Sequence, residues 1–242
     1  MDGGFSDIWV YLSASPLLHL FLTLLAYLGG QKLYERLGMH PLVNPVLIAV
    51  IVLVAILIVT RTPYLVYFEG AQFVHFLLGP ATVALALPLY RQVSRIRKSL
   101  LPVLLSVIFG SLVATGSAVA IAWLFGVSEA TLISIAPKSV TTPVAMGISE
   151  KLGGLPSLTA VFVILTGILG AMIGPLMLDL FRFKDWAARG FAIGITAHGI
   201  GTARAMQVSE VAGAFSGLAM GLNALATAIL LPLLWRLFSK RP

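Results

Sequence analysis

The sequence predicts an all-α polytopic membrane protein, with about seven transmembrane helices, a re-entrant hairpin, and broken helices that meet at a central site. Hydrophobic residues make up 59% of the 242 positions and charged residues only 10%, whereas charged residues make up about 25% of a typical soluble domain. Uncharged apolar runs of about 20 residues, the length that spans a hydrocarbon core, recur along the chain. A soluble enzyme is therefore excluded.

Five apolar runs are the clearest candidate spans. They are Ile8–Leu28, Pro41–Thr60, Leu100–Phe125, Leu155–Phe181 and Val211–Phe238. The first ten residues are acidic and offer no clear cleavage site, so the first run is expected to be a retained helix rather than a signal peptide. The second run reaches spanning length only if the stretch from Pro41 to Pro45 is included. Residues 1–242 are expected to form a single transmembrane domain.

Three less apolar segments lie between these spans, and each is expected to be a helix interrupted at its centre. The segments are Glu69–Gln92, Ser128–Leu152 and Lys184–Glu210, with breaks at Gly79-Pro80, Pro137–Pro143 and Ala197–Thr202. Some residues recur 57 positions apart, namely Pro80 with Pro137, Gly110 with Gly167 and Pro175 with Pro232. We interpret residues 69–125, 126–182 and 183–239 as three repeats, as in transporter folds; chance matching of common residue types is the alternative.

The excess of basic residues, a formal net charge of +7, gathers in short clusters between the apolar runs. That distribution is typical of the cytoplasmic loops of a multi-pass protein in the cell (inner or plasma) membrane, not of a nucleic-acid-binding surface. With Gln31–Gly38 and Arg91–Lys98 in the cytoplasm, Ser128–Leu152 decides the topology. If it crosses, the later basic residues fall outside; if it is re-entrant, they fall inside. Seven spans plus one hairpin obey the positive-inside rule and are favoured.

The stretch Pro137-Lys-Ser-Val-Thr-Thr-Pro143 is the first candidate binding site. Its two prolines prevent a continuous helix, and unpaired backbone at membrane depth is tolerated only inside protein or along a water-filled cavity. A lysine, hydroxyl groups and a helix N-terminus near Pro143 favour a small anion. The predicted substrate-binding residues are Lys138, Ser139, Thr141 and Thr142. The alternative is a surface loop with a solvated lysine.

The stretch Thr196–Arg204 is the second candidate. Glycines permit a sharp opening of the helix, histidine carries a proton near neutral pH, and arginine holds a carboxylate through two parallel bonds. The predicted substrate-binding residues are His198, Gly199, Gly201, Thr202 and Arg204, and His198 is also the proton-coupling candidate. The alternative is an arginine that extends to the lipid headgroups and a histidine packed in the core.

Signatures of other chemistries are missing from the sequence. With no cysteine, the chain has no disulfide, thiol nucleophile or Cys-ligated metal. It contains no His-Glu-x-x-His, Gly-x-Ser-x-Gly or Walker A motif. We therefore expect no enzymatic activity, no metal and no cofactor.

Three stretches resemble the signatures of the LrgB/CidB family, which includes YohK-type bacterial inner-membrane proteins and is similar to the carboxy-terminal half of the plastid glycolate/glycerate translocator. The stretches are Phe76–Tyr90 (FLLGPATVALALPLY), Pro137–Pro143 (PKSVTTP) and His198–Ala205 (HGIGTARA). The resemblance covers nearly the whole chain, and three long motifs in order make it specific.

The resemblance implies two functions. One is secondary transport of small monocarboxylates, such as glycolate, glycerate or pyruvate, by alternating access. The other is a holin/antiholin-like role that regulates murein hydrolases and lysis. The residues favour transport, because an oligomeric pore does not need broken helices that carry a lysine, an arginine and a histidine. The expected partners are a small organic anion, the lipid bilayer, a second copy in a homo-oligomer (a dimer) and a small LrgA/CidA-type membrane protein, but no nucleic acid.

Overall fold

All regular elements in the described part of the computed structural model are helices, which confirms the all-α class. The structure describes residues 15–77, 80, 83–84 and 86–239. The chain divides into two compact units, Met1–Ala84 and Leu85–Pro242, and each is described by itself. The boundary between them falls inside the first predicted repeat, and the three repeats stay a prediction.

The described residues of the first unit form the helices α2 (Pro16–Arg36), α3 (Pro45–Val59) and α4 (Tyr64–Phe76). The sequence predicted a loop over Gln31–Gly38, and this prediction was wrong, because α2 continues to Arg36. Its last turns are made of good helix formers, and the Gln31 side chain donates to Glu35 Oε1 one turn later at 2.9 Å. The predicted span Ile8–Leu28 begins outside the described residues.

Helix α3 is shorter than the predicted span Pro41–Thr60. It begins only at Pro45, because the Asn44 side chain caps it by accepting from the backbone N–H groups of Val46 and Leu47. Its 15 residues extend about 22 Å, less than a hydrocarbon core of about 30 Å. Helix α4 lies close against α2, since a Cβ on Gly70 would overlap the Pro16 carbonyl oxygen.

The second unit contains the remaining described helices. They are α6 (Ala86–Arg91), α7 (Val93–Lys98), α8 (Leu100–Leu124), α9 (Glu129–Ile135), α10 (Thr142–Leu152), α11 (Pro156–Leu180), α12 (Trp186–Val208) and α13 (Glu210–Ser239). Among the described residues, the helices long and apolar enough to cross a membrane are α8, α11 and α13. These three confirm the spans predicted from Leu100, Leu155 and Val211. The first predicted break, at Gly79-Pro80, includes Gly79, which lies outside the described residues.

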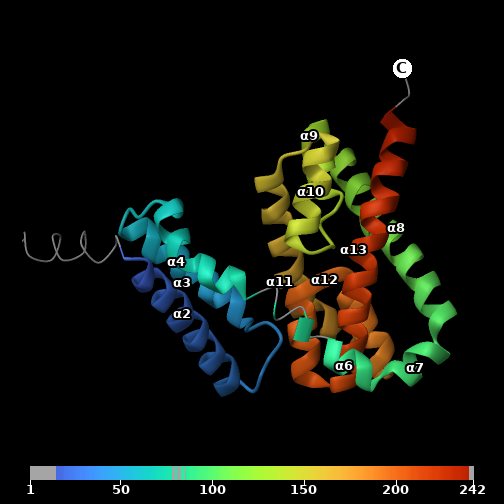
Figure 1. The fold of residues 1–242 in the computed structure, drawn as a ribbon, viewed down its shortest axis with the longest axis horizontal. Helices are drawn as coiled ribbons and strands as arrows, with labels where there is room; N and C mark the ends of the chain where they lie inside the picture. The colour runs from blue at the N-terminus through green and yellow to red at the C-terminus, as the bar shows by residue number, and fades with distance from the viewer. Residues whose placement is uncertain (1–14, 78–79, 81–82, 85, 240–242) are drawn as a thin grey trace, which may run out of the picture. The chain divides into compact units, whose positions relative to one another are not determined.

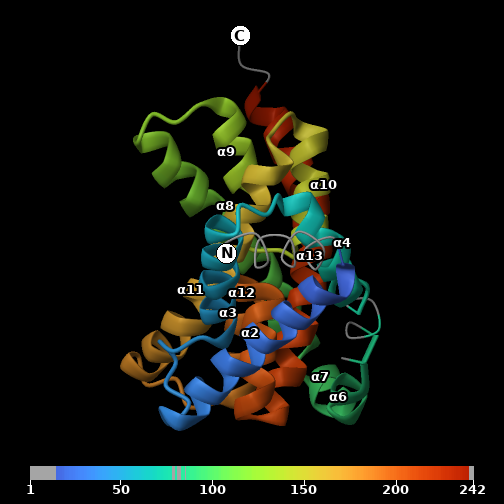
Figure 2. The same ribbon diagram turned by 90° about the vertical axis from the view of Figure 1, so that its left-hand side faces the viewer.

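The helices of this unit have two distinct ends (Figures 1 and 2). At one end, here called the α9 end, lie α9, α10 and the last turns of α13; at the other, the α6 end, lie α6 and α7. Helix α13 starts at the α6 end, where Arg91 and Glu210 form an ion pair at 3.3 Å. Helix α11 starts at the α9 end, where the Leu155 N–H donates to Ser134 Oγ at 2.8 Å. The three long helices therefore alternate in direction.

Helices α9 and α10 form a hairpin around the predicted break at Pro137–Pro143. Ala136 and Ile148 belong to one hydrophobic cluster, and Val140 and Ala145 belong to another. Residues before the turn therefore pair with residues after it, in antiparallel order. The hairpin begins and ends at the α9 end of the unit (Figure 1).

Helix α12 also folds back on itself, whereas the favoured count of seven spans plus one hairpin needs Lys184–Glu210 to cross the membrane. Its one non-helical residue is His198. A Cβ on Gly201 would lie 2.5 Å from the Ala197 Cβ and 2.7 Å from the Ile193 side chain, whereas positions eight residues apart in a straight helix are about 12 Å apart. The expectation that Lys184–Glu210 crosses was therefore wrong: both of its ends lie at the α6 end.

Close packing against α13 is the physical reason for this fold-back. Gly190 and Gly194 leave no room for a Cβ against the backbone of Ala212 and Ser216, so the first half of α12 lies directly on α13. After the turn, Gly213 contacts Met206 in the same manner. Small residues let helix backbones approach this closely in membrane proteins.

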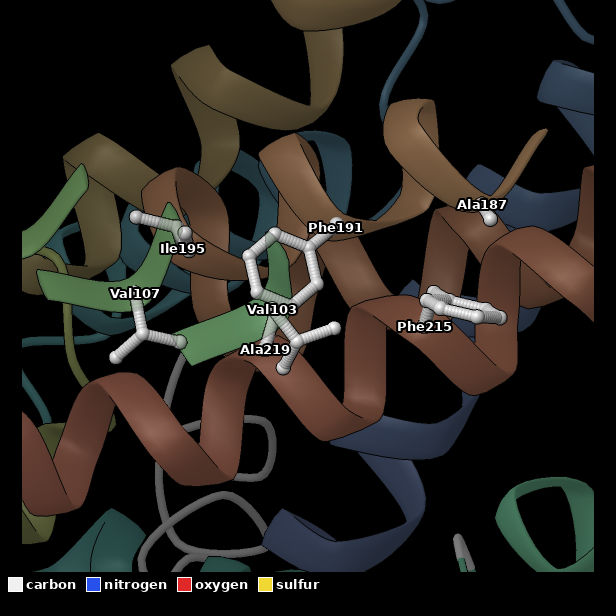
Figure 3. Close-up of a cluster of buried hydrophobic side chains, with 7 residues drawn as sticks. All are labelled: Val103, Val107, Ala187, Phe191, Ile195, Phe215 and Ala219. Atoms are coloured by element: carbon white, nitrogen blue, oxygen red, sulfur yellow. The ribbon is translucent and has the colours of Figure 1, made fainter. Parts of the chain in front are cut away.

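A cluster of buried hydrophobic side chains joins α8, α12 and α13 (Figure 3). Its members are Val103, Val107, Ala187, Phe191, Ile195, Phe215 and Ala219. The first half of α12 is thus enclosed between two of the long helices.

Candidate functional site

The two breaks predicted from the sequence meet within the second unit. Tip 1 is the turn of the α9–α10 hairpin, residues Pro137–Thr141, and tip 2 is the turn of α12, residues Ile195–Gly199. Asn223 of α13 joins them, because its Nδ2 donates to the Ser139 carbonyl oxygen at 3.2 Å and to the Ile195 carbonyl oxygen at 3.0 Å. The structure therefore brings together segments about 60 residues apart in sequence.

Tip 1 is a tight turn that places a cation beside a hydroxyl group. The Lys138 N–H donates to the Ile135 carbonyl oxygen at 3.1 Å, which ends α9. The Lys138 ammonium donates to Ser139 Oγ at 3.2 Å. Ser139 is buried and Lys138 is half-buried. The partial burial of Lys138 favours the interior site over the surface-loop alternative.

Helix α10 begins directly after tip 1. Thr141 is its N-cap residue and Thr142 its first residue, and both are half-buried. The Thr141 side chain makes no capping hydrogen bond, and the first N–H groups of a helix have no intrahelical acceptor. The positive end of the α10 dipole therefore lies beside Lys138, which favours an anion at this position.

Tip 2 is built around a strained histidine. His198 has φ 38° and ψ −129°, a conformation that residues other than glycine rarely adopt and that persists at functional sites when the surroundings enforce it. The sequence assigned the opening of the helix to Gly199 and Gly201, but the break is at His198 itself. Gly199 is exposed with open space around it, while buried Gly201 permits the close return of the chain.

The His198 ring is held by α11. Its Nε2 lies 2.9 Å from the Val163 carbonyl oxygen, and because a carbonyl only accepts, Nε2 carries the hydrogen. A Cβ on Gly167 would lie 2.6 Å from the ring, so α11 has no side chain where the ring is seated. This tautomer leaves Nδ1 as the acceptor. Lys138 lies within electrostatic range of the ring.

Thr202 is engaged in the turn of α12. Its hydroxyl donates to the His198 carbonyl oxygen at 2.7 Å and lies 2.9 Å from Ser216 Oγ of α13. The side chain is buried. Thr202 was predicted to bind substrate, which stays a prediction, and in this structure its hydroxyl bonds to the strained backbone at tip 2.

Arg204 lies at the foot of the α12 hairpin, away from its tip. It lines a small pocket together with Trp186, Arg189 and Val208, residues at the two ends of α12. Arg204 lies six helical positions after His198, which corresponds to about 9 Å along the helix. The structure thus groups Lys138, Ser139, Thr141, Thr142 and His198 around the tips and places Arg204 in a separate environment.

The charge around the tips is positive. All acidic residues of the second unit lie at or next to helix ends, and they are Glu129, Glu150, Asp179, Asp185 and Glu210. Helix α10 and the second half of α12 each begin directly after a tip, and Lys138 lies in tip 1. In the described residues no three His, Asp or Glu side chains gather to hold a metal. The arrangement suits a small anion.

A large cavity lies in another part of the second unit. It has a volume of about 630 Å³ and lies between α8, α9 and α13, where mostly apolar side chains and Trp123 and Trp235 line it. Ser111 and Thr227 also line it, and the Ser111 hydroxyl lies 2.9 Å from Thr227 Oγ1. Because the tips contribute no lining residue, cavity size alone would have missed the polar centre.

Asn223 is the residue of the centre that reasoning from the sequence missed. It lies in α13, which was read as an apolar span, and only 1% of it is exposed. The available signal was its spacing: Ser216, Asn223 and Thr227 follow an i, i+7, i+11 pattern that forms one polar stripe on a helix. Polar side chains inside a membrane helix mark contacts between helices.

Comparison with known proteins agrees with the resemblance noted in the sequence. The family model described as the LrgB-like family matches residues 23–237. The chain is 41% identical to the uncharacterized protein YwbG of Bacillus subtilis, over 89% of this chain and 95% of that protein. It is 34% identical to the holin-like protein CidB of Staphylococcus epidermidis, over 94% of this chain and 98% of that protein.

A second CidB, from Staphylococcus aureus, is 31% identical over 92% of this chain and 96% of its own length. No solved structure matches the chain. With a family match over most of its length, the chain belongs to the LrgB-like family.

Proposed function

We propose that this chain serves in the cell membrane the holin-like role for which its CidB relatives are named, and that a small organic anion bound between tips 1 and 2 takes part in it. The names of the relatives support this role more directly than the transport function that the residues alone favoured. The resemblance to the LrgB/CidB family implies that this role is the regulation of murein hydrolases and lysis. A small LrgA/CidA-type membrane protein is the proposed partner.

The anion site is supported by one observation above all: Asn223 binds the backbone of both tips, and one tip carries Lys138. We infer that the α9–α10 hairpin and the folded α12 are re-entrant from opposite faces of the bilayer. Irregular backbone at membrane depth needs protein or a water-filled cavity around it. Half-helices whose N-termini point at an anionic group are the form that such sites take in membrane proteins.

Cells that produce the chain provide the test of the holin-like role. Production should change the rate of lysis and the murein hydrolase activity seen on zymograms, and Lys138→Met should reduce this effect. Lys151→Met is the matched control, because Lys151 lies exposed near the C-terminal end of α10. No change in lysis with the unmodified chain would contradict the holin-like role. If both variants change lysis equally, anion binding at Lys138 takes no part in that role.

Transport of a small monocarboxylate is the second candidate. The observation that favours it is that the α9–α10 hairpin and the folded α12 start from different ends of the second unit and meet at their tips. Burial of a charge costs free energy, so a half-buried lysine beside helix N-termini indicates a function. A simple pore has no need of such a lysine. Proteoliposomes separate the two candidates: a transporter gives saturable uptake of labelled lactate or glycolate without release of a trapped dye, and a holin-like pore releases the dye. Absence of saturable uptake would contradict transport.

A further inference from the structure

The cavity between α8, α9 and α13 is a groove that takes no part in the anion site. Its volume of about 630 Å³ falls within the range of about 300–1,000 Å³ that is typical of ligand sites. Its inner side contains Ser111 and Thr227, which are buried and hydrogen-bonded to each other. Its lining also includes Leu112 and Trp123, which are exposed. Because Leu112 lies in the middle of α8, the groove opens towards the hydrocarbon core.

The groove follows α8 over about the thickness of one membrane leaflet. Its lining on α8 runs from Ser111 to Trp123, which corresponds to about 18 Å along the helix. One leaflet contributes about half of a hydrocarbon core of about 30 Å. Gly116 also lines the groove, and a Cβ on this residue would meet no atom within 4 Å. The length, the mostly apolar lining and this open space fit a single lipid acyl chain.

Two tryptophans mark the α9 end of the groove as the level of the lipid headgroups. Trp123 is the second-last residue of α8, and Trp235 lies in the last turns of α13, at the α9 end (Figure 1). Tryptophan is enriched where the hydrocarbon core meets water, because its ring is apolar and its N–H is polar. Glu129, the first residue of α9, lines the groove at this same end. A lipid chain in the groove would place its headgroup beside these three side chains.

The charge at this end of the groove favours an ammonium group. Among the described residues that line the groove, Glu129 is the only charged one. Its carboxylate forms no ion pair within the described part of the chain. A headgroup that carries only a phosphate would meet this carboxylate with repulsion. An ammonium group is attracted both to the carboxylate and to the faces of the tryptophan rings.

We propose that this groove is a binding site for a membrane phospholipid with an ammonium headgroup, of the phosphatidylethanolamine class. One acyl chain lies along α8 and α13, and the ammonium binds at Glu129 beside Trp123 and Trp235. The lipid site shares no residue with tips 1 and 2. It therefore does not depend on the anion site of the proposed function, and either site can fail while the other stands.

Brominated lipids test the proposal, because bromine on an acyl chain quenches the fluorescence of a tryptophan that it contacts. Trp9→Phe and Trp186→Phe leave Trp123 and Trp235 as the only tryptophans of the full-length chain. This chain is reconstituted in phosphatidylglycerol vesicles with increasing fractions of brominated phosphatidylethanolamine or of brominated phosphatidylglycerol with the same acyl chains. Half-maximal quenching should need about three- to tenfold less of the ethanolamine lipid, as contacts of one ammonium with a carboxylate and an aromatic face imply.

Variants with matched controls locate the site. Glu129→Gln should remove the preference for the ethanolamine lipid. Glu150→Gln should keep it, because Glu150 is an exposed acid near the end of α10 that does not line the groove. Gly116→Phe should fill the groove and reduce quenching by both lipids. Gly221→Phe should not, because Gly221 also has open space around it but lies outside the groove.

The comparison of the two lipids with Glu129 in place needs none of these groove variants, so a folding defect in them cannot obscure it. Equal quenching by the two lipids would overturn the proposal, and so would a preference that Glu129→Gln leaves intact. Absence of quenching by either lipid would also overturn it, because protein rather than lipid would then cover the groove.

Discussion

The ring of His198 in α12 donates from Nε2 to the carbonyl oxygen of Val163 in α11, over 2.9 Å. This hydrogen bond anchors the most strained backbone position of the α12 hairpin to a helix of membrane-spanning length. It also determines the tautomer of the ring, with Nδ1 as the nitrogen that can gain a proton. The same side chain therefore has a structural task at one nitrogen and a chemical opportunity at the other.

His198→Gln tests that division of tasks. The glutamine amide can still donate to the Val163 carbonyl oxygen, so the variant should fold with a thermal midpoint within a few degrees of the unmodified protein. It cannot titrate near neutral pH, so anion uptake should lose its pH dependence between about pH 5 and 8. Uptake in proteoliposomes across that range is the measurement. A pH profile that stays unchanged would remove His198 as the proton carrier.

Arg204→Met should have less effect on anion binding than Lys138→Met. The structure places Arg204 in the pocket with Trp186 and Arg189, whereas Lys138 lies at tip 1. Loss of a charge-assisted bond of about 1.5–3 kcal/mol at Lys138 should weaken binding about ten- to a hundred-fold. Affinity for labelled lactate, measured on equal amounts of folded protein, compares the two variants. A larger loss for Arg204→Met would restore the sequence-based expectation that this arginine binds the carboxylate.

Cysteines in this Cys-free chain report the topology. Because α12 folds back at His198, the start of α13 and the α6–α7 region lie at the same end of the unit. Ser94→Cys and Arg236→Cys should therefore be labelled by an impermeant maleimide from opposite faces of the membrane. The positive-inside rule assigns Ser94, within the Arg91–Lys98 cluster, to the cytoplasm. Labelling of both cysteines from one face would mean that α12 crosses the bilayer.

Gly190→Ala should destabilise the fold, and Gly199→Ala should not. A Cβ at Gly190 would overlap the Ala212 carbonyl oxygen, so α12 would have to move away from α13. Overpacking of this kind costs about 1–3 kcal/mol. Gly199 has open space around it and serves as the control on the same helix. Thermal unfolding of the purified proteins in detergent compares them, and equal midpoints would mean that this helix contact adjusts without cost.

Much of the molecule follows from local sequence. The spans of α8, α11 and α13 were predicted because hydrophobicity over about 20 residues is read directly from the chain. The break between Pro137 and Pro143 was predicted for a similar reason, since proline removes a backbone donor wherever it stands. The prediction that tip 1 binds an anion also came from neighbours in sequence, because Lys138 precedes the N-terminus of α10.

Only the tertiary structure decided where the chain goes after each break. The residues near His198 in sequence do not predict that α12 reverses. The reversal depends on the fit of Gly190 and Gly194 against α13, about 22 residues further on. The same packing separates Arg204 from Lys138, although the sequence analysis had assigned both residues to one binding site. It also carries Asn223, one polar residue in an apolar helix, to the point where both tips meet. Sequence thus determined the breaks and their charges, and long-range packing determined which of them form one site.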